Sequence, residues 1–176
     1  MTRTATKFAA ALALISTGEL QAAQTAAAAN CLNRAELRGL MGYMMPSVVS
    51  LLIVRCKPGL PAGAYLATEG QQLVNQLEAG RKDSWPMAKQ AFAKLAGEDP
   101  KVATMLDAMP ESMLRPVLED KLADKLVSEI KSQDCKDIDR VMGTLAPLPP
   151  GNLVDFATEL AILGSRDKKE LNVCAS

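Results

Sequence analysis

The most informative part of the chain is CLNRAELRGLMGYMMPSVVSLLIVRC, residues 31–56, which starts and ends on a cysteine. Asn33 is a good helix N-cap, and Glu36 three residues later completes a capping-box pattern. Leucines and methionines then recur on one face of the expected helix. Pro46 interrupts this pattern because proline is best tolerated in a first helical turn. We therefore expect one helix over 33–45 and a second over 47–55.

The segment 39–54 carries no charge and is the most apolar stretch after the N-terminal region. A helix that is apolar on all sides usually lies buried at the centre of its domain. It also lines ligand cavities in some proteins, or inserts into a membrane or docks onto a partner. If it lines a cavity, we expect a pocket for an apolar ligand formed by Tyr43, Met44, Leu51, Leu52 and Ile53.

The N-terminal residues predict export from the cytoplasm. Arg3 and Lys7 form a short basic head, an apolar run covers residues 8–15, and small or polar residues follow up to Asn30. This order is typical of a secretory signal peptide, and the apolar run is too short to span a membrane. We expect a signal over 1–29, cleavage near residues 27–30, and a periplasmic or secreted protein with no membrane span in its mature part.

Four cysteines, Cys31, Cys56, Cys135 and Cys174, occur in the chain. An even number of thiols in an exported protein predicts two disulfides, and three pairings are possible. The absence of a C-x-x-C pattern excludes the usual redox and zinc spacings. Two helices folded back on each other at each end of the chain favour Cys31–Cys56 and Cys135–Cys174, which gives two disulfide-stapled helical hairpins.

The remaining chain shows helical spacing and no strand alternation, so we expect an all-α fold. About 147 residues suit one domain, which we place at 30–176 as an irregular bundle of about seven or eight helices. Caps, prolines and glycines place these helices at 33–45, 47–55, 68–80, 84–97, 100–109, 111–131, 135–146 and 152–164.

Composition argues against several functions. Removing Arg3, Lys7 and Glu19 from 20 basic and 20 acidic residues leaves 18 and 19, so no basic surface for nucleic acid is expected. No histidine occurs, and no serine-nucleophile or nucleotide-binding motif is present. We therefore expect no catalytic residue, no cofactor and no metal. Two methionine clusters have thioethers suited to Cu(I), but core filling explains them better: Met41, Met44, Met45, Met105, Met109 and Met113.

Three segments resemble a family of short exported helical proteins of unknown activity from alphaproteobacteria. These are CLNRAELRGLMGYMMP (31–46), GLPAGAYL (59–66) and DCKDIDRVMGTLAPLPP (134–150). The resemblance covers roughly residues 31–174. Its motifs are cysteines, caps and prolines, so it implies a placement and no catalytic residues.

Taken together, the sequence predicts a non-catalytic periplasmic protein that works by contact with another periplasmic protein. The alternative is a carrier of lipid or another apolar ligand. An enzyme without a recognisable motif is the third option, because such a site needs an unusual carboxylate or lysine arrangement.

Overall fold

The computed structural model describes residues 31–95, 104, 106, 108–118, 127–165 and 172–174. Within these residues the chain forms six α-helices and no extended strand, as the all-α prediction requires, although seven or eight helices were expected. The signal peptide predicted over 1–29 lies outside the described residues. The helices are α2 (Arg34–Cys56), α3 (Tyr65–Thr68), α4 (Gly70–Leu95), α6 (Glu111–Leu118), α8 (Cys135–Leu145) and α9 (Pro150–Ser165).

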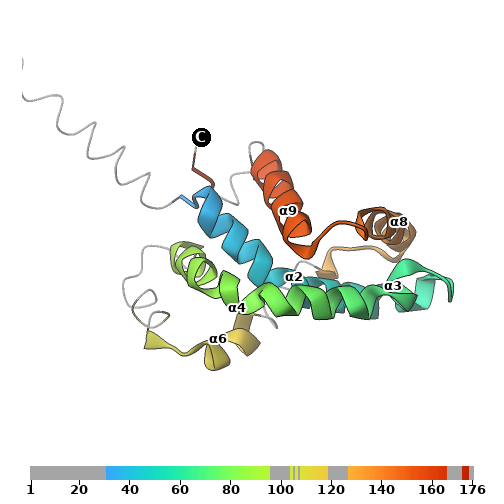
Figure 1. Ribbon diagram of the computed structural model, residues 1–176, viewed down its shortest axis with the longest axis horizontal. Helices are drawn as coiled ribbons and strands as arrows, with labels where there is room; N and C mark the ends of the chain where they lie inside the picture. The colour runs from blue at the N-terminus through green and yellow to red at the C-terminus, as the bar shows by residue number, and fades with distance from the viewer. Residues whose placement is uncertain are drawn as a thin grey trace, which may run out of the picture.

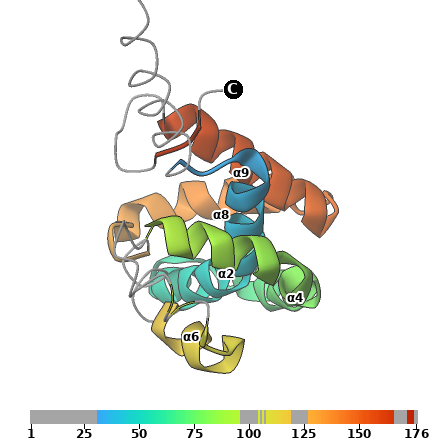
Figure 2. The same ribbon diagram turned by 90° about the vertical axis from the view of Figure 1, so that its left-hand side faces the viewer.

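α2 begins as the sequence predicts and continues further than predicted. The Asn33 side chain accepts from the Glu36 amide at 2.9 Å, and the Glu36 carboxylate accepts from the Asn33 amide at 2.9 Å, which confirms the capping box. The expected break at Pro46 is wrong, because the helix runs through this buried proline to Cys56. Pro46 removes one helical hydrogen bond, and the two halves of α2 lie at an angle to each other (Figures 1 and 2).

α4 shows the same departure from the sequence pattern. The expected helices over 68–80 and 84–97 are one continuous helix, Gly70–Leu95, and Pro86 lies inside it rather than in a first turn. α4 also changes direction along its length in both views (Figures 1 and 2). Local proline signals are therefore overridden here by tertiary packing.

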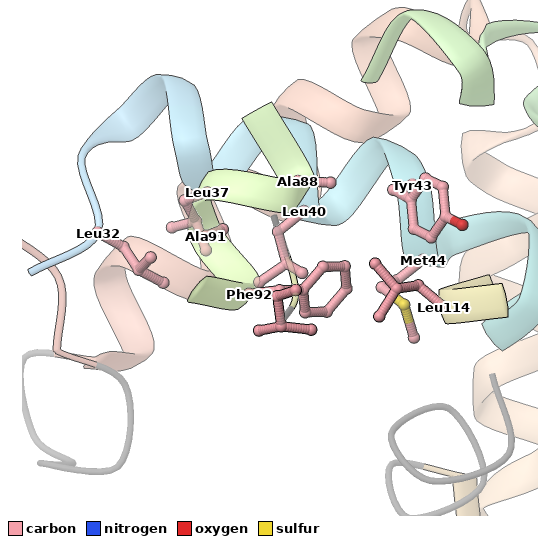
Figure 3. Packing of buried hydrophobic residues seen from close by; sticks show 10 residues of the cluster. Leu32, Leu37, Leu40, Tyr43, Met44, Ala88, Ala91, Phe92 and Leu114 are labelled. Atoms are coloured by element: carbon pink, nitrogen blue, oxygen red, sulfur yellow. The ribbon is translucent and has the colours of Figure 1, made fainter. Parts of the chain in front are cut away.

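α2 and α4 pack antiparallel along most of their lengths. A Cβ atom on Gly39 would lie 2.4 Å from the Met87 Cβ, and one on Gly42 would lie 2.4 Å from the Ser84 Oγ. The two glycines therefore let the helix backbones approach closely. The main core cluster forms beside this crossing and includes Leu32, Leu37, Leu40, Tyr43, Met44, Ala88, Ala91, Phe92 and Leu114 (Figure 3).

The C-terminal helices cover other parts of this pair. α9 contacts both α2 and α4, where its Leu153 and Val154 join a second cluster with Val49, Leu73 and Leu77. α8 packs against the short helix α3, and the Asp139 carboxylate accepts from the Leu66 amide at 2.7 Å. An acid on α8 thus caps α3, a contact between segments distant in the sequence.

Two disulfides are present, but the predicted pairing is wrong. Cys31 bonds to Cys174, and Cys56 bonds to Cys135. No disulfide therefore staples a hairpin to itself. The prediction assumed that Pro46 reverses the chain between Cys31 and Cys56, whereas the continuous helix α2 holds these two residues at its opposite ends. Each end of α2 is instead bonded to a segment from the C-terminal part of the chain.

The ends of the described chain also share backbone hydrogen bonds. Leu32 and Val173 form an isolated parallel bridge, in which the Leu32 amide donates to the Asn172 carbonyl at 2.7 Å. α8 and α9 lie within a residue or two of their predicted ranges. The helix expected over 100–109, and the part of the 111–131 helix beyond 118, fall largely outside the described residues.

Candidate functional site

A cleft opens where α2, α4 and the first turn of α9 meet. Its volume is about 360 Å³. The floor includes Gly39, Gly42, Leu77 and Val154, and further lining comes from Ala35, Arg38, Gln76, Gly80, Asp83, Ser84, Met87, Pro150 and Gly151. The cleft therefore combines an apolar floor with amide, hydroxyl, carboxylate and guanidinium groups.

Glycines keep this cleft open. A Cβ atom on Gly80 or Gly151 would meet no heavy atom within 4 Å, so both positions face open space. Any larger side chain at Gly80 would extend into the cleft. The guanidinium of Arg38 lies at the rim and pairs with the Asp155 carboxylate of α9.

The outer face of α9 is apolar and exposed. Phe156, Leu160 and Leu163 are 43%, 52% and 53% exposed, and their spacing of four and three residues places them on one side of the helix. The opposite side carries the buried Val154 and Thr158, whereas Leu153 lies one turn before Phe156 on the same side and is buried at the start of the helix. We call Phe156, Leu160 and Leu163 the α9 outer face; Figure 1 shows α9 at one side of the molecule.

The acidic residues of α9 lie at one edge of this face and are neutralised by α2. Arg34 pairs with Glu159, and Arg38 pairs with Asp155. The sequence of α9 contains no lysine or arginine. The α9 outer face is therefore flanked by ion-paired acids and has no basic side chain of its own.

A buried arginine lies between α2 and α4. The Arg81 side chain is 3% exposed, donates to Glu78 at 3.0 Å and to the Ser47 hydroxyl at 3.1 Å, and stacks over the Tyr43 ring at 4.5 Å. Tyr43 itself packs against Trp85 with ring centroids 4.9 Å apart. These contacts pair the two terminal nitrogens of the buried guanidinium and hold the helix pair together, which is a structural role.

The predicted pocket residues occupy packed positions. Tyr43 and Met44 lie in the main core cluster, and Leu51 packs against it. Leu52 is buried, and Ile53 packs beside the second and third clusters. None of these five side chains lines the cleft between α2, α4 and α9.

α2 with its following turn, Arg34–Gly59, is long and apolar enough to cross a membrane by length and composition. Half of its most apolar stretch is buried, and a helix in the core of a soluble protein can have the same length and composition. Among the described residues, no cluster of three metal-binding side chains of the histidine, cysteine or carboxylate type occurs. The methionines are divided, since Met44 is buried and Met113 is 62% exposed.

Sequence reasoning missed both the cleft and the α9 outer face. The cleft depends on glycines from three helices, which no local pattern brings together. The α9 outer face had a signal: apolar residues occur on all sides of 150–165, whereas a helix on the surface needs only one apolar side. This excess of apolar residues predicts that the helix is either fully buried or covered by a partner. In the structure its outer side is exposed.

The described residues thus define a helical protein with two disulfides and two candidate contact features. Comparison of the chain with protein-family profiles, with curated protein sequences and with solved structures finds no match. The two features are therefore interpreted from their own geometry and chemistry.

Proposed function

We propose that this protein is a non-catalytic interaction module of the periplasm, exported by its N-terminal signal, that binds protein through the α9 outer face. The observation that carries the proposal is the exposed apolar row of Phe156, Leu160 and Leu163 on a helix whose other side is anchored in the core. Contiguous exposed apolar side chains on a folded protein usually mark an interaction site.

The oxidising environment indicated by the disulfides and the fixed helix pair beneath α9 support this proposal. Two disulfides indicate an oxidising environment outside the cytoplasm. The disulfides, the buried Arg81 contacts and the close approach at Gly39 and Gly42 fix α2 and α4, on which α9 lies. A rigid support of this kind lowers the entropy cost of presenting a contact surface. The resemblance of residues 31–174 to exported alphaproteobacterial proteins agrees with this placement and is part of the proposal.

A charge placed on the α9 outer face tests the proposal. Leu160→Lys puts an ammonium group in the centre of the contact, while Val54→Lys changes a 69% exposed apolar residue on α2 and serves as the matched control. We expect native purification of the processed protein to recover a stoichiometric protein complex from the unaltered chain and Val54→Lys. Leu160→Lys should lose it. Equal recovery from both variants contradicts the proposal.

The second candidate function is binding of a small ligand, and the cleft between α2, α4 and α9 favours it. Its volume of about 360 Å³ lies within the usual range for small-molecule sites. Its mixed lining suits a small molecule with one apolar side and one polar side. This candidate gives the carrier alternative a second location, while the pocket at Tyr43, Met44, Leu51, Leu52 and Ile53 stays a prediction.

Filling the cleft separates the two functions. Gly80→Leu adds a side chain where no heavy atom lies within 4 Å, and Gly164→Leu does the same on α9 away from the cleft. If the protein is a carrier, native mass spectrometry should detect a bound small molecule in the unaltered chain and Gly164→Leu but not in Gly80→Leu. Unliganded spectra for all three proteins contradict the carrier function.

A further inference from the structure

We propose that the α9 outer face binds the same face of a second copy of this chain, with the two α9 helices antiparallel and Leu160 beside the two-fold axis. This inference rests on the proposed function and names its partner. A two-fold contact of this kind uses one surface twice and closes the assembly as a dimer.

When two copies of α9 run antiparallel, a large residue of one copy faces a small residue of the other. With Leu160 of each copy at the axis, Phe156 of one copy lies opposite Gly164 of the other. A Cβ atom on Gly164 would meet no heavy atom of the described residues within 4 Å, so this position has space for a side chain of the other copy. Each Phe156 ring thus fills the space that the other copy leaves open, and it does so twice by symmetry.

The charges at the edge of the face also permit a second copy. In an antiparallel two-fold pair, the edges that carry Asp155 and Glu159 fall on the same side of the contact, where bare acids from two copies would repel each other. Each acid is already paired within its own copy, Glu159 with Arg34 and Asp155 with Arg38. Four neutralised acids remove this repulsion, which would otherwise be strong near an apolar seam.

The same charges disfavour a membrane as the occupant. Helices that lie in a membrane surface carry lysine or arginine beside their apolar face, where they meet anionic lipid headgroups. α9 has no basic residue, and the two arginines beside it, Arg34 and Arg38, are paired with its acids. A protein surface is therefore the better match, and a copy of α9 supplies both the apolar row and the facing glycine. One helix is a small contact area, so the dimer should be reversible and depend on concentration.

Cysteine crosslinking tests the register of the pair. All four native cysteines are in disulfides, so an added thiol is the sole free one. Leu160→Cys should form a covalent dimer on mild oxidation, at least about tenfold faster than the exposed control Val54→Cys, because axis residues meet their own copies. A mixture of Phe156→Cys and Gly164→Cys should crosslink between the two variants. Peptide mapping confirms that the native disulfides are intact.

Sedimentation of the processed, oxidised protein provides the second measurement. The mass of the unaltered chain and of Val54→Lys should rise towards that of a dimer with concentration, and Leu160→Lys should stay monomeric. Arg34→Glu with Arg38→Glu should also abolish the dimer, with partial recovery at high salt. The proposal that the partner is a second copy is overturned if the unaltered chain is monomeric at every concentration and Leu160→Cys crosslinks no faster than Val54→Cys. If native purification then recovers a different protein with the unaltered chain and Val54→Lys but not with Leu160→Lys, the proposed function holds with that protein as the partner.

Discussion

Single residues set how closely the two long helices approach. Gly39 and Gly42 leave no room for a Cβ atom, whereas Gly80, also inside a helix, faces the open cleft. The same amino acid thus has opposite roles at positions that look alike in the sequence. What distinguishes them is the neighbouring helix, and no local pattern reports it.

Replacing Gly39 and Gly80 by alanine should change stability in opposite directions. Gly39→Ala forces a methyl group against the Met87 Cβ and the Ala88 backbone, and we expect a loss of about 1–3 kcal/mol in the free energy of unfolding. Gly80→Ala meets nothing and should gain about 0.5–1 kcal/mol from helix propensity. Urea unfolding measures both, and an unchanged stability for Gly39→Ala argues against the close crossing.

The Arg81 side chain should contribute strongly to stability because it is buried and makes three kinds of contact. We expect Arg81→Ala to lower the free energy of unfolding by about 2–4 kcal/mol. Arg81→Lys should recover only part of the loss, because an ammonium group cannot reproduce the guanidinium fork. The exposed neighbour Lys82→Ala is the control, with an effect within about 0.5 kcal/mol in the same urea titration.

Tyr65 should make stability depend on pH in alkaline solution. Burial, followed by the negative charge of Glu69, raises the pKa of Tyr65 above its ordinary value of 10.0. The folded state therefore holds this proton more tightly, so the stabilisation is full below pH 10 and is lost as pH rises through the folded pKa. Urea midpoints measured from about pH 9 to about pH 11 should fall less for Tyr65→Phe than for the unaltered chain. Equal slopes contradict the assignment.

The helices show which part of the fold the sequence reveals. Local signals predicted the Asn33 capping box, since a cap and its first turn lie within four residues. The start of α8 at Cys135 is also as predicted, although no side-chain hydrogen bond caps this helix. Pro46 and Pro86 misled the prediction because packing of α2 against α4 stabilises both helices beyond their propensity. The error at Pro46 then gave the wrong disulfide pairing, since a continuous helix separates Cys31 from Cys56.

The short helix α3 depends on another helix for its start. It has only four residues, which are too few for independent stability, and the Asp139 carboxylate from α8 accepts from the amides of Tyr65 and Leu66. We expect Asp139→Ala to cost about 1 kcal/mol and to speed hydrogen exchange at these two amides. The exposed Asp137→Ala should leave exchange unchanged. If both variants lose protection from exchange at these amides, the cause is a change in α8 as a whole and not the loss of the cap.

The whole molecule is held by bonds between distant segments. Cys31–Cys174 spans 143 residues and Cys56–Cys135 spans 79, so each disulfide closes a long loop. The candidate surfaces follow from this arrangement as well, because the cleft and α9 both depend on a C-terminal helix packing on an N-terminal pair. Sequence patterns predicted that disulfides exist and that α9 is helical, but they carry no information on which distant segments meet.

Removing either disulfide should lower stability substantially. The chain-entropy relation gives roughly 4–5 kcal/mol for each loop. We expect Cys31→Ala with Cys174→Ala, and Cys56→Ala with Cys135→Ala, to shift the urea midpoint downwards by similar amounts. Non-reducing peptide mapping of the unaltered chain should find Cys31 joined to Cys174. A Cys31–Cys56 peptide would contradict the structure.

The Cys31–Cys174 bond turns the described chain into a covalent ring, and the Cys56–Cys135 bond divides that ring into two smaller ones. A protease that cuts the exposed loop near Gly63 therefore releases no fragment while both bonds are oxidised. The ring also tolerates relocation of its ends: a circular permutant opened at Gly63 keeps the same cross-links and the same helix neighbours. While both bonds stay oxidised, a single cut in this loop leaves every helix covalently joined to the rest.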